Sequence, residues 1–109
     1  MATAYKILGQ QQSVALTDVD AYTVPSATQS VVSTIVITNR SATAGTYNLA
    51  VRASGATIDP KHYLAYGAPI AGNDATILTI GITLSATDVV TFQASSDDMS
   101  INIFGSEIS

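Results

Sequence analysis

Cysteine and tryptophan are both absent from this 109-residue sequence, and charged residues are scarce. The lack of cysteine excludes disulfide bonds, thiolate metal sites and cysteine nucleophiles. Charged residues make up only 11% of the chain, which is about half of the share usual in globular proteins. The basic residues are few and scattered: Lys6, Arg40, Arg52 and Lys61. Because they form no phosphate-binding stripe, we expect no direct binding to nucleic acid.

Long apolar runs are absent as well. No run reaches the ~18 residues that a membrane helix needs, and the start MATAYKILGQQQ lacks the charged region and apolar core of a signal peptide. We therefore expect no membrane contact and synthesis in a cytoplasm. The 47% apolar content argues against disorder. With so few charges, either neighbouring molecules cover much of the surface or a Ser/Thr-rich sheet face is exposed.

Residues for catalysis or metal binding are also missing. The single histidine, His62, has no histidine partner for a zinc site, and no serine lies in a nucleophile-elbow pattern. Most of the acids fall at predicted turns, where Asp side chains bond their own backbone. Asp18/Asp20 and Asp97/Asp98 are the pairs that a calcium site could use. The sequence predicts no catalytic residue, no metal site and no cofactor, so we do not expect an enzyme.

The segment Gln29–Arg40, QSVVSTIVITNR, is dense in β-branched residues and predicts a long strand. Strict alternation places Val31, Ile35 and Ile37 on one face, which we expect to face the core. The other face is mixed and consists of Val32, Thr34, Val36 and Thr38. A face of this kind is typical of a sheet surface that is only partly covered, and Thr38 on it is a candidate interface residue.

Further strands are predicted by the same period of two. Thr46–Ala53 alternates cleanly and follows a small-residue loop, so we expect it to form a hairpin with Gln29–Arg40. Ala75–Leu84 predicts a second long strand in which Gly81 marks a bulge or a close backbone approach. Shorter strands are predicted at His62–Tyr66, Asp88–Ala94 and Met99–Phe104, followed by a tail, Gly105–Ser109.

These elements together predict one all-β domain. About seven or eight strands at roughly ten-residue spacing, without a helix, are typical of an antiparallel β-sandwich of jelly-roll or immunoglobulin-like type. We expect Ile35, Leu49, Ile80 and Phe92 to be buried in its core. The sandwich is predicted to span residues 17–109.

Residues 1–16 are predicted to be an N-terminal arm or an edge strand. Tyr5 and Ile7 share one face of a short strand, Ala4–Leu8, while Leu8 lies on the other and Gly9 ends the strand. Two alternatives stay open at this point. The segment can reach a neighbouring subunit by strand addition, with Tyr5, Ile7 and Leu8 as interface residues, or it can be an edge strand of its own domain.

Tyr63 and Tyr66, beside His62, also have two interpretations. They can form a small stacking platform for sugars, or they can pack at the rim of the sandwich with their hydroxyls in water. The absence of tryptophan favours the second interpretation. We keep both tyrosines as candidate interface residues.

Several segments spread over most of the chain carry a family resemblance: Tyr22–Pro25, Val31–Val36 with Thr38–Arg40, Tyr47 through Arg52, Ile80–Thr91 and Ile103–Ile108. In these segments the sequence resembles short virion structural proteins of tailed bacteriophages, especially those of cyanobacteria and other aquatic hosts. The resemblance implies a non-enzymatic component of the virion, assembled in the host cytoplasm. Its implied partners are copies of itself and other virion proteins, such as the major capsid or tail proteins.

Within the particle, the resemblance leaves two locations open. The first expectation is a capsid decoration protein that stabilises the particle through protein–protein contacts, and the second is a tail or baseplate part. The alternative from another class is a carbohydrate-binding or host-adhesion module, because fold alone does not decide between these roles.

Overall fold

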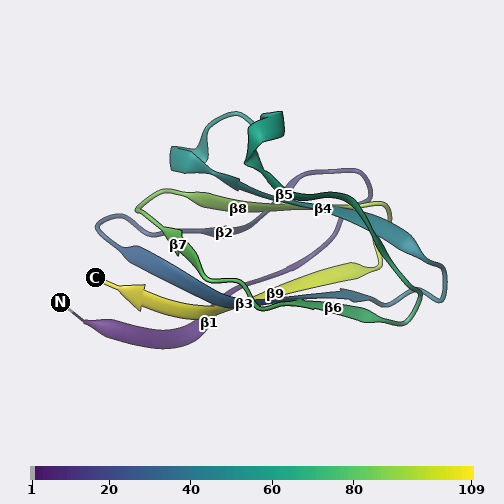
Figure 1. Cartoon of the computed structure of the whole chain (residues 1–109), viewed down its shortest axis with the longest axis horizontal. Helices are drawn as coiled ribbons and strands as arrows, with labels where there is room; N and C mark the ends of the chain where they lie inside the picture. The colour runs from purple at the N-terminus through teal and green to yellow at the C-terminus, as the bar shows by residue number, and fades with distance from the viewer. Residues whose placement is uncertain (1) are drawn as a thin grey trace.

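The protein is a sandwich of two antiparallel sheets, and the computed structural model describes residues 2–109. Figure 1 shows the two layers facing each other. Sheet I has five strands: β1 (Thr3–Gln12), β9 (Met99–Ile108), β3 (Gln29–Asn39), and β6 (Ala75–Leu78) with β7 (Ile82–Leu84), which both pair with β3. Sheet II has four: β2 (Val19–Thr23), β8 (Val89–Ala94), β4 (Gly45–Arg52) and β5 (Tyr63–Ile70). Two short 3-10 helices, η1 (Ala53–Gly55) and η2 (Pro60–His62), connect β4 to β5.

The pairing of the strands identifies the sandwich as a jelly roll. β1 pairs with β9, β2 with β8, β3 with β6 and β7, and β4 with β5, always antiparallel. The first half of the chain therefore pairs with the second half in reverse order, like one long hairpin that is rolled into two sheets. With β6 and β7 taken as one interrupted strand, this is the eight-stranded jelly-roll order. The predicted β-sandwich is confirmed, and of its two predicted types the jelly roll is the one observed.

The core lies between the sheets and is built from the inward faces of both. Ile35, Leu49 and Phe92 have no exposed surface, as predicted. The fully buried residues of the two sheets include Val32, Ile35, Ile37, Met99, Ile101 and Ile103 from sheet I and Leu49, Val90 and Phe92 from sheet II. In β9 the buried residues Met99, Ile101 and Ile103 follow the period of two that an extended strand with one inward face requires.

The predicted faces of Gln29–Arg40 are wrong in its first half. Val32 is fully buried, whereas Val31 is 37% exposed. Val32 is paired with Gly105 and Thr34 with Phe104, so Ser33 is an extra residue in β3. A bulge of this kind shifts the alternation by one residue. Strict period-two reasoning therefore fails upstream of Ser33 and holds from Ile35 onwards.

The predicted long strand Ala75–Leu84 is interrupted, and Ile80 is not a core residue. β6 ends at Leu78, β7 begins at Ile82, and Ile80 between them is 38% exposed. β6 pairs with residues 35–38 of β3 and β7 with residues 30–32, so the break lies opposite the β3 bulge. The extra residue in β3 prevents one continuous partner from keeping its register. A Cβ at Gly81 would meet no atom within 4 Å, so no close backbone approach exists there.

The predicted hairpin of Gln29–Arg40 with Thr46–Ala53 does not form. β3 belongs to sheet I and β4 to sheet II, so the connecting loop crosses between the sheets. The buried side chain of Asn39 holds this crossing, because its Nδ2 donates to the carbonyls of Thr43 at 2.9 Å and Ala71 at 3.3 Å, and its Oδ1 accepts from the Ser41 amide at 3.0 Å. Each of these two strands has one strongly apolar face, and both faces are buried because the strands lie in two sheets that face each other.

Three strands run further than predicted. β1 continues through Gly9 to Gln12, β5 continues through Gly67 and Pro69 to Ile70, and β9 includes Gly105–Ile108 in place of a tail. Pro69 is accommodated because β5 is an edge strand. The end of β9 is held on both sides by β1 and β3.

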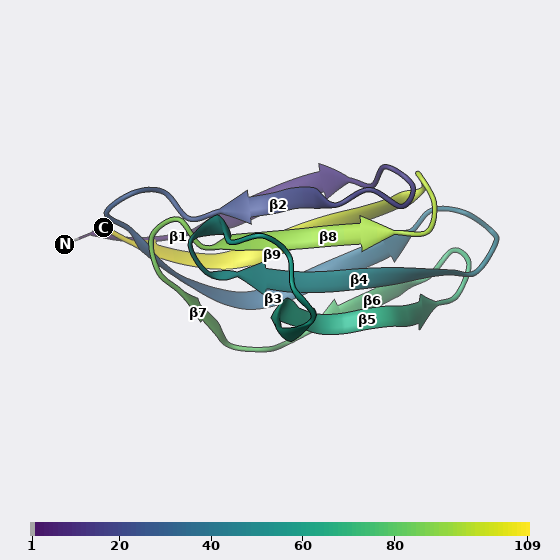
Figure 2. The same cartoon turned by 90° about the horizontal axis from the view of Figure 1, so that it is seen from above.

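Residues 1–16 are joined to the sandwich by β1, which is an edge strand of sheet I. Met1 lies outside the described residues. β1 and β9 run side by side to the end of the sandwich where the chain begins and ends (Figure 2), and the backbones of Ala2 and Ser109 exchange two hydrogen bonds there. The described part of this segment is therefore the edge strand of the two alternatives, and its contact with another subunit stays a prediction. Residues 2–109 include no helix with the length and apolarity that crossing a membrane requires.

Candidate functional site

The outer face of sheet I carries no charged residue. Its strands contain only two charges in the described chain, Lys6 in β1 and Glu107 in β9. Both side chains lie on the inner side, because Glu107 contacts Tyr22 of the opposite sheet and Lys6 contacts Glu107. The surface that sheet I turns to solvent is therefore made only of apolar and neutral polar side chains.

The strand registers arrange the outward side chains of sheet I in rows, because residues directly opposite each other share a face. One row runs from Tyr5 through Ser106 to Val31, and the next from Ile7 through Phe104 to Thr34. A third runs from Gln10 through Asn102 and Val36 to Ile77. The apolar members form what we call the outer patch: Tyr5, Ile7, Val31, Val36, Ile77 and Phe104.

Several members of the outer patch are strongly exposed. Tyr5 is 87% exposed, Ile77 64% and Ile7 51%, while Val36 and Phe104 are half-buried by their neighbours. Single exposed apolar residues are common on protein surfaces, but a contiguous set marks a surface that binds another molecule. The absence of charge makes burial easier, because no ion has to be desolvated.

The outer face of sheet II differs, since its polar side chains bond to one another. The Arg52 guanidinium lies 2.9 Å from Asp20 Oδ1 and also donates to Thr91 Oγ1 at 2.9 Å. Beside it, Asn48 Nδ2 donates to Gln93 Oε1 at 3.0 Å. These residues satisfy their polar groups within the chain, so the two outer faces of the sandwich differ in chemical character.

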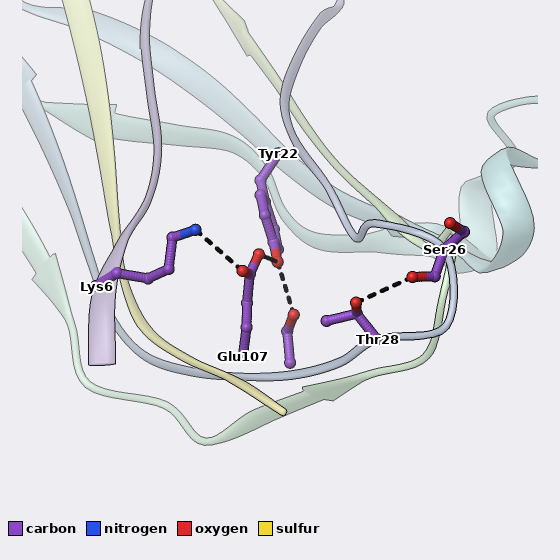
Figure 3. A network of polar contacts seen from close by, with 6 residues as sticks. Lys6, Tyr22, Ser26, Thr28 and Glu107 are labelled. Carbon is purple, nitrogen blue, oxygen red and sulfur yellow. Dashed lines mark hydrogen bonds and ion pairs between the residues drawn. The ribbon is translucent and has the colours of Figure 1, made fainter. Parts of the chain in front are cut away.

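A partly buried polar network lies between the sheets near the chain ends (Figure 3). Tyr22 donates its hydroxyl hydrogen to Glu107 Oε2 at 2.6 Å, and its oxygen lies 2.6 Å from Ser30 Oγ. Lys6 Nζ donates to Glu107 Oε1 at 3.0 Å. Burial, together with the hydrogen bond to Glu107, raises the pKa of Tyr22 to about 12. The hydrogen bonds from Tyr22 and then Lys6 lower the pKa of Glu107 below its ordinary value.

The network is a structural connection between the sheets. Glu107 stays ionised and Tyr22 stays protonated near neutral pH, because the lowered and raised pKa values favour those forms. Each polar atom in it has a partner, as buried polar groups require. Among the described residues, no group of three His, Asp or Glu side chains lies close enough together to hold a metal ion.

A second candidate site is a hollow of about 350 Å³ beside β5. It is lined by Ile58, Asp59, Pro60, Tyr63 and Tyr66. The two tyrosine rings meet edge to face with their centroids 4.8 Å apart. Burial, the charge of Asp18 and the neighbouring Tyr66 raise the pKa of Tyr63.

The turn before β5 shapes this hollow. Asp59 Oδ1 accepts from the Lys61 amide at 3.2 Å, and the Asp59 amide donates to His62 Nδ1 at 3.0 Å. This capping arrangement holds η2, and it gives His62 a local structural partner. The walls are mostly apolar, with the Asp59 carboxylate and two phenol hydroxyls as polar groups.

The structure divides the predicted interface residues between three places. Tyr5, Ile7 and Thr38 lie on the outer face of sheet I, whereas Tyr63 and Tyr66 lie at the hollow beside sheet II. Leu8 is only 9% exposed and packs in the core, because it lies on the face of β1 opposite Tyr5 and Ile7. We therefore place Leu8 among the core residues and not at an interface.

Four members of the outer patch were missed as site residues: Val31, Val36, Ile77 and Phe104. Alternation already separates Phe104 from the buried Met99, Ile101 and Ile103, so its outward direction was detectable from the sequence. Its neighbours were not detectable, because a common face for residues of β1, β3, β6 and β9 follows only from the pairing of distant strands.

Comparison with known proteins identifies no family. No protein-family model and no curated protein sequence matches the chain. Among solved structures, one described as "Structure of infectious bursal disease virus Gx strain" is similar to 97% of this chain, with a TM-score of 0.46 and 10% sequence identity. This chain spans 30% of the length of that one. A likeness at such low identity concerns the fold alone, and a fold does not determine function.

Proposed function

We propose that this protein is a non-enzymatic structural component of a tailed-phage virion that binds its partners through the outer patch. The observation that carries the proposal is the contrast between the two outer faces. The face of sheet I is uncharged and exposes Tyr5, Ile7 and Ile77, whereas polar groups on the face of sheet II are paired within the chain. A face of the first kind suits burial against a partner. The resemblance of the sequence to virion proteins of tailed phages supports the same role.

The finer proposal is a capsid decoration protein, with a tail or baseplate part as the other location. A decoration protein stabilises a head by adding buried interface on a symmetric lattice. Apolar surface contributes roughly 25 cal/mol for each Å² removed from water, so a flat uncharged sheet face suits this role. The partners would be copies of this chain and the major capsid or tail protein, and assembly would take place in the host cytoplasm.

Quantitative mass spectrometry of separated heads and tails from purified phage particles tests this proposal. A decoration protein should be present on heads at about one copy for each capsid subunit or small group of subunits, because it follows the lattice symmetry. A copy number of tens, confined to tails, would instead place the protein in a tail ring or baseplate. Complete absence of the chain from the particles would refute the structural role.

A second candidate function, a carbohydrate-binding or host-adhesion module, is favoured by the hollow at Tyr63 and Tyr66. Its apolar walls, aromatic rings and single carboxylate can hold a sugar ring, with C–H groups against a phenol ring and hydroxyls on Asp59. Glycan-array binding by the isolated protein tests this function. Binding that is lost in Tyr66→Ala, a residue that is 72% exposed, would support it, because this change leaves the core intact.

A further inference from the structure

The two sheets of the sandwich have four edges, and three of them carry features that prevent pairing with another strand. β6 and β7 are four and three residues long and are separated by a break. β5 contains Pro69 and a Gly67 with φ of 61°, and its register with β4 shifts twice. β2 has five residues and a register shift beside Asp20, which forms an ion pair with Arg52. Short strands, prolines, bulges and charges are the devices by which natural sheets protect their edges.

The fourth edge, β1, carries weaker forms of these devices. It is ten residues long, contains no proline, and its only charge is Lys6. A charge on an edge strand, including one that points to the inner side of the sheet, ordinarily opposes pairing, because a partner strand would bury it. Here Lys6 is turned to the inner side and is paired with Glu107 of its own chain at 3.0 Å. The ion pair neutralises that charge and so weakens its protection, and the bulge at Leu8 is the other protective feature that this edge carries.

The hydrogen-bond pattern shows which backbone groups of β1 are unused. The backbones of Ala2 and Ser109 exchange two hydrogen bonds, so Ala2 points its N–H and C=O groups towards β9. Successive residues of a strand point these groups to opposite edges, so the next residue and every second residue after it point them away from β9. These residues are Thr3, Tyr5 and Ile7. Beyond the bulge, the Ser13 amide donates to the Met99 carbonyl, so Ser13 and every second residue before it point their backbone groups towards β9. Gln10 and Gln12 then also point their backbone groups to the outer edge.

We propose that β1 pairs antiparallel with β1 of a second copy of this chain, which joins two copies of sheet I into one continuous sheet. The choice of a second copy as the partner depends on the assembly role proposed above. A two-fold axis between the strands lets each copy satisfy the other's unused groups, as a symmetric dimer interface requires. The pairing would also bring Tyr5 and Ile7 of both copies together, so the outer patches become one apolar surface.

Charge favours a copy of the same chain over a charged partner strand. The molecule has a net charge of −4, and two copies repel each other at most of their surfaces. The β1 edge is an exception, because Lys6 and Glu107 neutralise each other and the rest of the strand is uncharged. Two such edges can approach without opposed like charges, and an uncharged edge offers no attraction to an acidic or basic strand.

The experiment removes one unused backbone N–H and keeps the rest of the strand. Gln10→Pro deletes an outward N–H, and the preceding Gly9 tolerates the restriction that proline imposes. Gln10→Ala is the matched control, since it removes the same side chain and keeps the N–H. We expect sedimentation equilibrium to show dimers for the natural chain and Gln10→Ala, and at least a tenfold higher dimer Kd for Gln10→Pro. Circular dichroism checks that each variant is folded.

A second variant keeps the backbone intact in case proline prevents folding. Gln10→Lys with Gln12→Lys adds two outward charges to each strand, which should raise the dimer Kd by at least tenfold at low salt and by less at high salt. A natural chain that is monomeric at about 100 μM, or lysine and proline variants that dimerise as well as the natural chain, would overturn the inference. Dimers that persist in these variants but dissociate in Ile77→Lys would place the contact on the outer patch instead.

The outcome for the dimer is separate from the outcome for the proposed function. A protein that dimerises through β1 but is absent from purified particles would keep the strand pairing and refute the virion role. A monomeric protein that is abundant on particles would do the reverse.

Discussion

Lys6 Nζ lies 3.0 Å from Glu107 Oε1, and these two residues are the only charges in the described strands of sheet I. The Lys6 side chain is 48% exposed, so the ion pair itself contributes no more than about 1 kcal/mol to stability. Its direction matters more than its strength. By drawing both charges to the inner side, the pair leaves an uncharged outer face and an uncharged β1 edge.

Tyr22→Phe should destabilise the fold by about 1–3 kcal/mol, because it leaves Ser30 and Glu107 without their hydrogen-bond partner between the sheets. Ser30 is only 1% exposed, so water cannot easily replace the lost contact. Urea denaturation measures the change. Tyr47→Phe is the matched control, since Tyr47 is also buried and the described residues offer its hydroxyl no hydrogen-bond partner. Equal losses in the two variants would show that the network contributes nothing.

Acid should weaken the fold through Glu107. Its pKa in the folded state is below the ordinary 4.5, so the unfolded chain takes up the proton first as pH falls. The stability from this group is therefore present above its unfolded pKa and is lost as pH falls through the folded pKa. Urea midpoints measured from about pH 6 to about pH 3 should fall more steeply for the natural chain than for Glu107→Gln. Parallel pH profiles would contradict this assignment.

Alkali should weaken the fold through Tyr22. Its folded pKa is raised from 10.0 to about 12, so in this interval the unfolded chain loses the phenol proton while the folded chain keeps it. Stability is thus full below pH 10 and declines as pH rises through the folded pKa. The melting temperature of the natural chain should fall over this interval, and Tyr22→Phe should lack this part of the decline. The ultraviolet absorbance of tyrosinate measures the titration directly.

Truncation to alanine should lower the free energy of unfolding much more at Ile35 than at Ile80. Ile35→Ala should cost about 2–5 kcal/mol, because it opens a cavity between the sheets. Ile80 is 38% exposed in the break between β6 and β7, so Ile80→Ala should cost about 1 kcal/mol or less. Chemical denaturation of both variants measures the difference. A large loss for Ile80→Ala would mean that this residue is buried after all.

The sequence predicted the core faces wherever the alternation was uninterrupted. Leu49, Phe92 and Ile103 lie on strands whose inward residues follow a period of two to the end, and all are fully buried. Val31 and Ile80 were placed wrongly for one reason. The bulge at Ser33 shifts the phase of β3 and interrupts its partner, and a serine within a β-branched run gives no sign of a bulge.

Strand pairing could not be predicted, because it depends on residues far apart in the sequence. β3 and β4 are joined by a short loop and looked like a hairpin, yet β3 pairs with β9 and β4 with β8. The same limit applies to the candidate site. The common face of Tyr5 and Ile7 is local and was predicted, but their neighbours Phe104 and Val31 follow from the registers of sheet I.

A single charge on the outer patch should prevent incorporation into particles without weakening the fold. Ile77→Lys is the best test, because Ile77 is 64% exposed and lies in β6, away from the β1 edge. Leu64→Lys is the matched control, since Leu64 is 50% exposed on a strand of sheet II. Both side chains are largely in water, so both variants should keep their free energy of unfolding within about 0.5 kcal/mol.

In particles assembled with each variant, Ile77→Lys should lower the bound copy number at least tenfold, because a lysine buried at the contact leaves an unpaired charge. Leu64→Lys should bind as the natural chain does. The opposite result, with loss only for Leu64→Lys, would move the contact to sheet II and to the neighbourhood of Tyr66. That outcome would favour the adhesion module, because the hollow beside β5 would then lie within the binding surface.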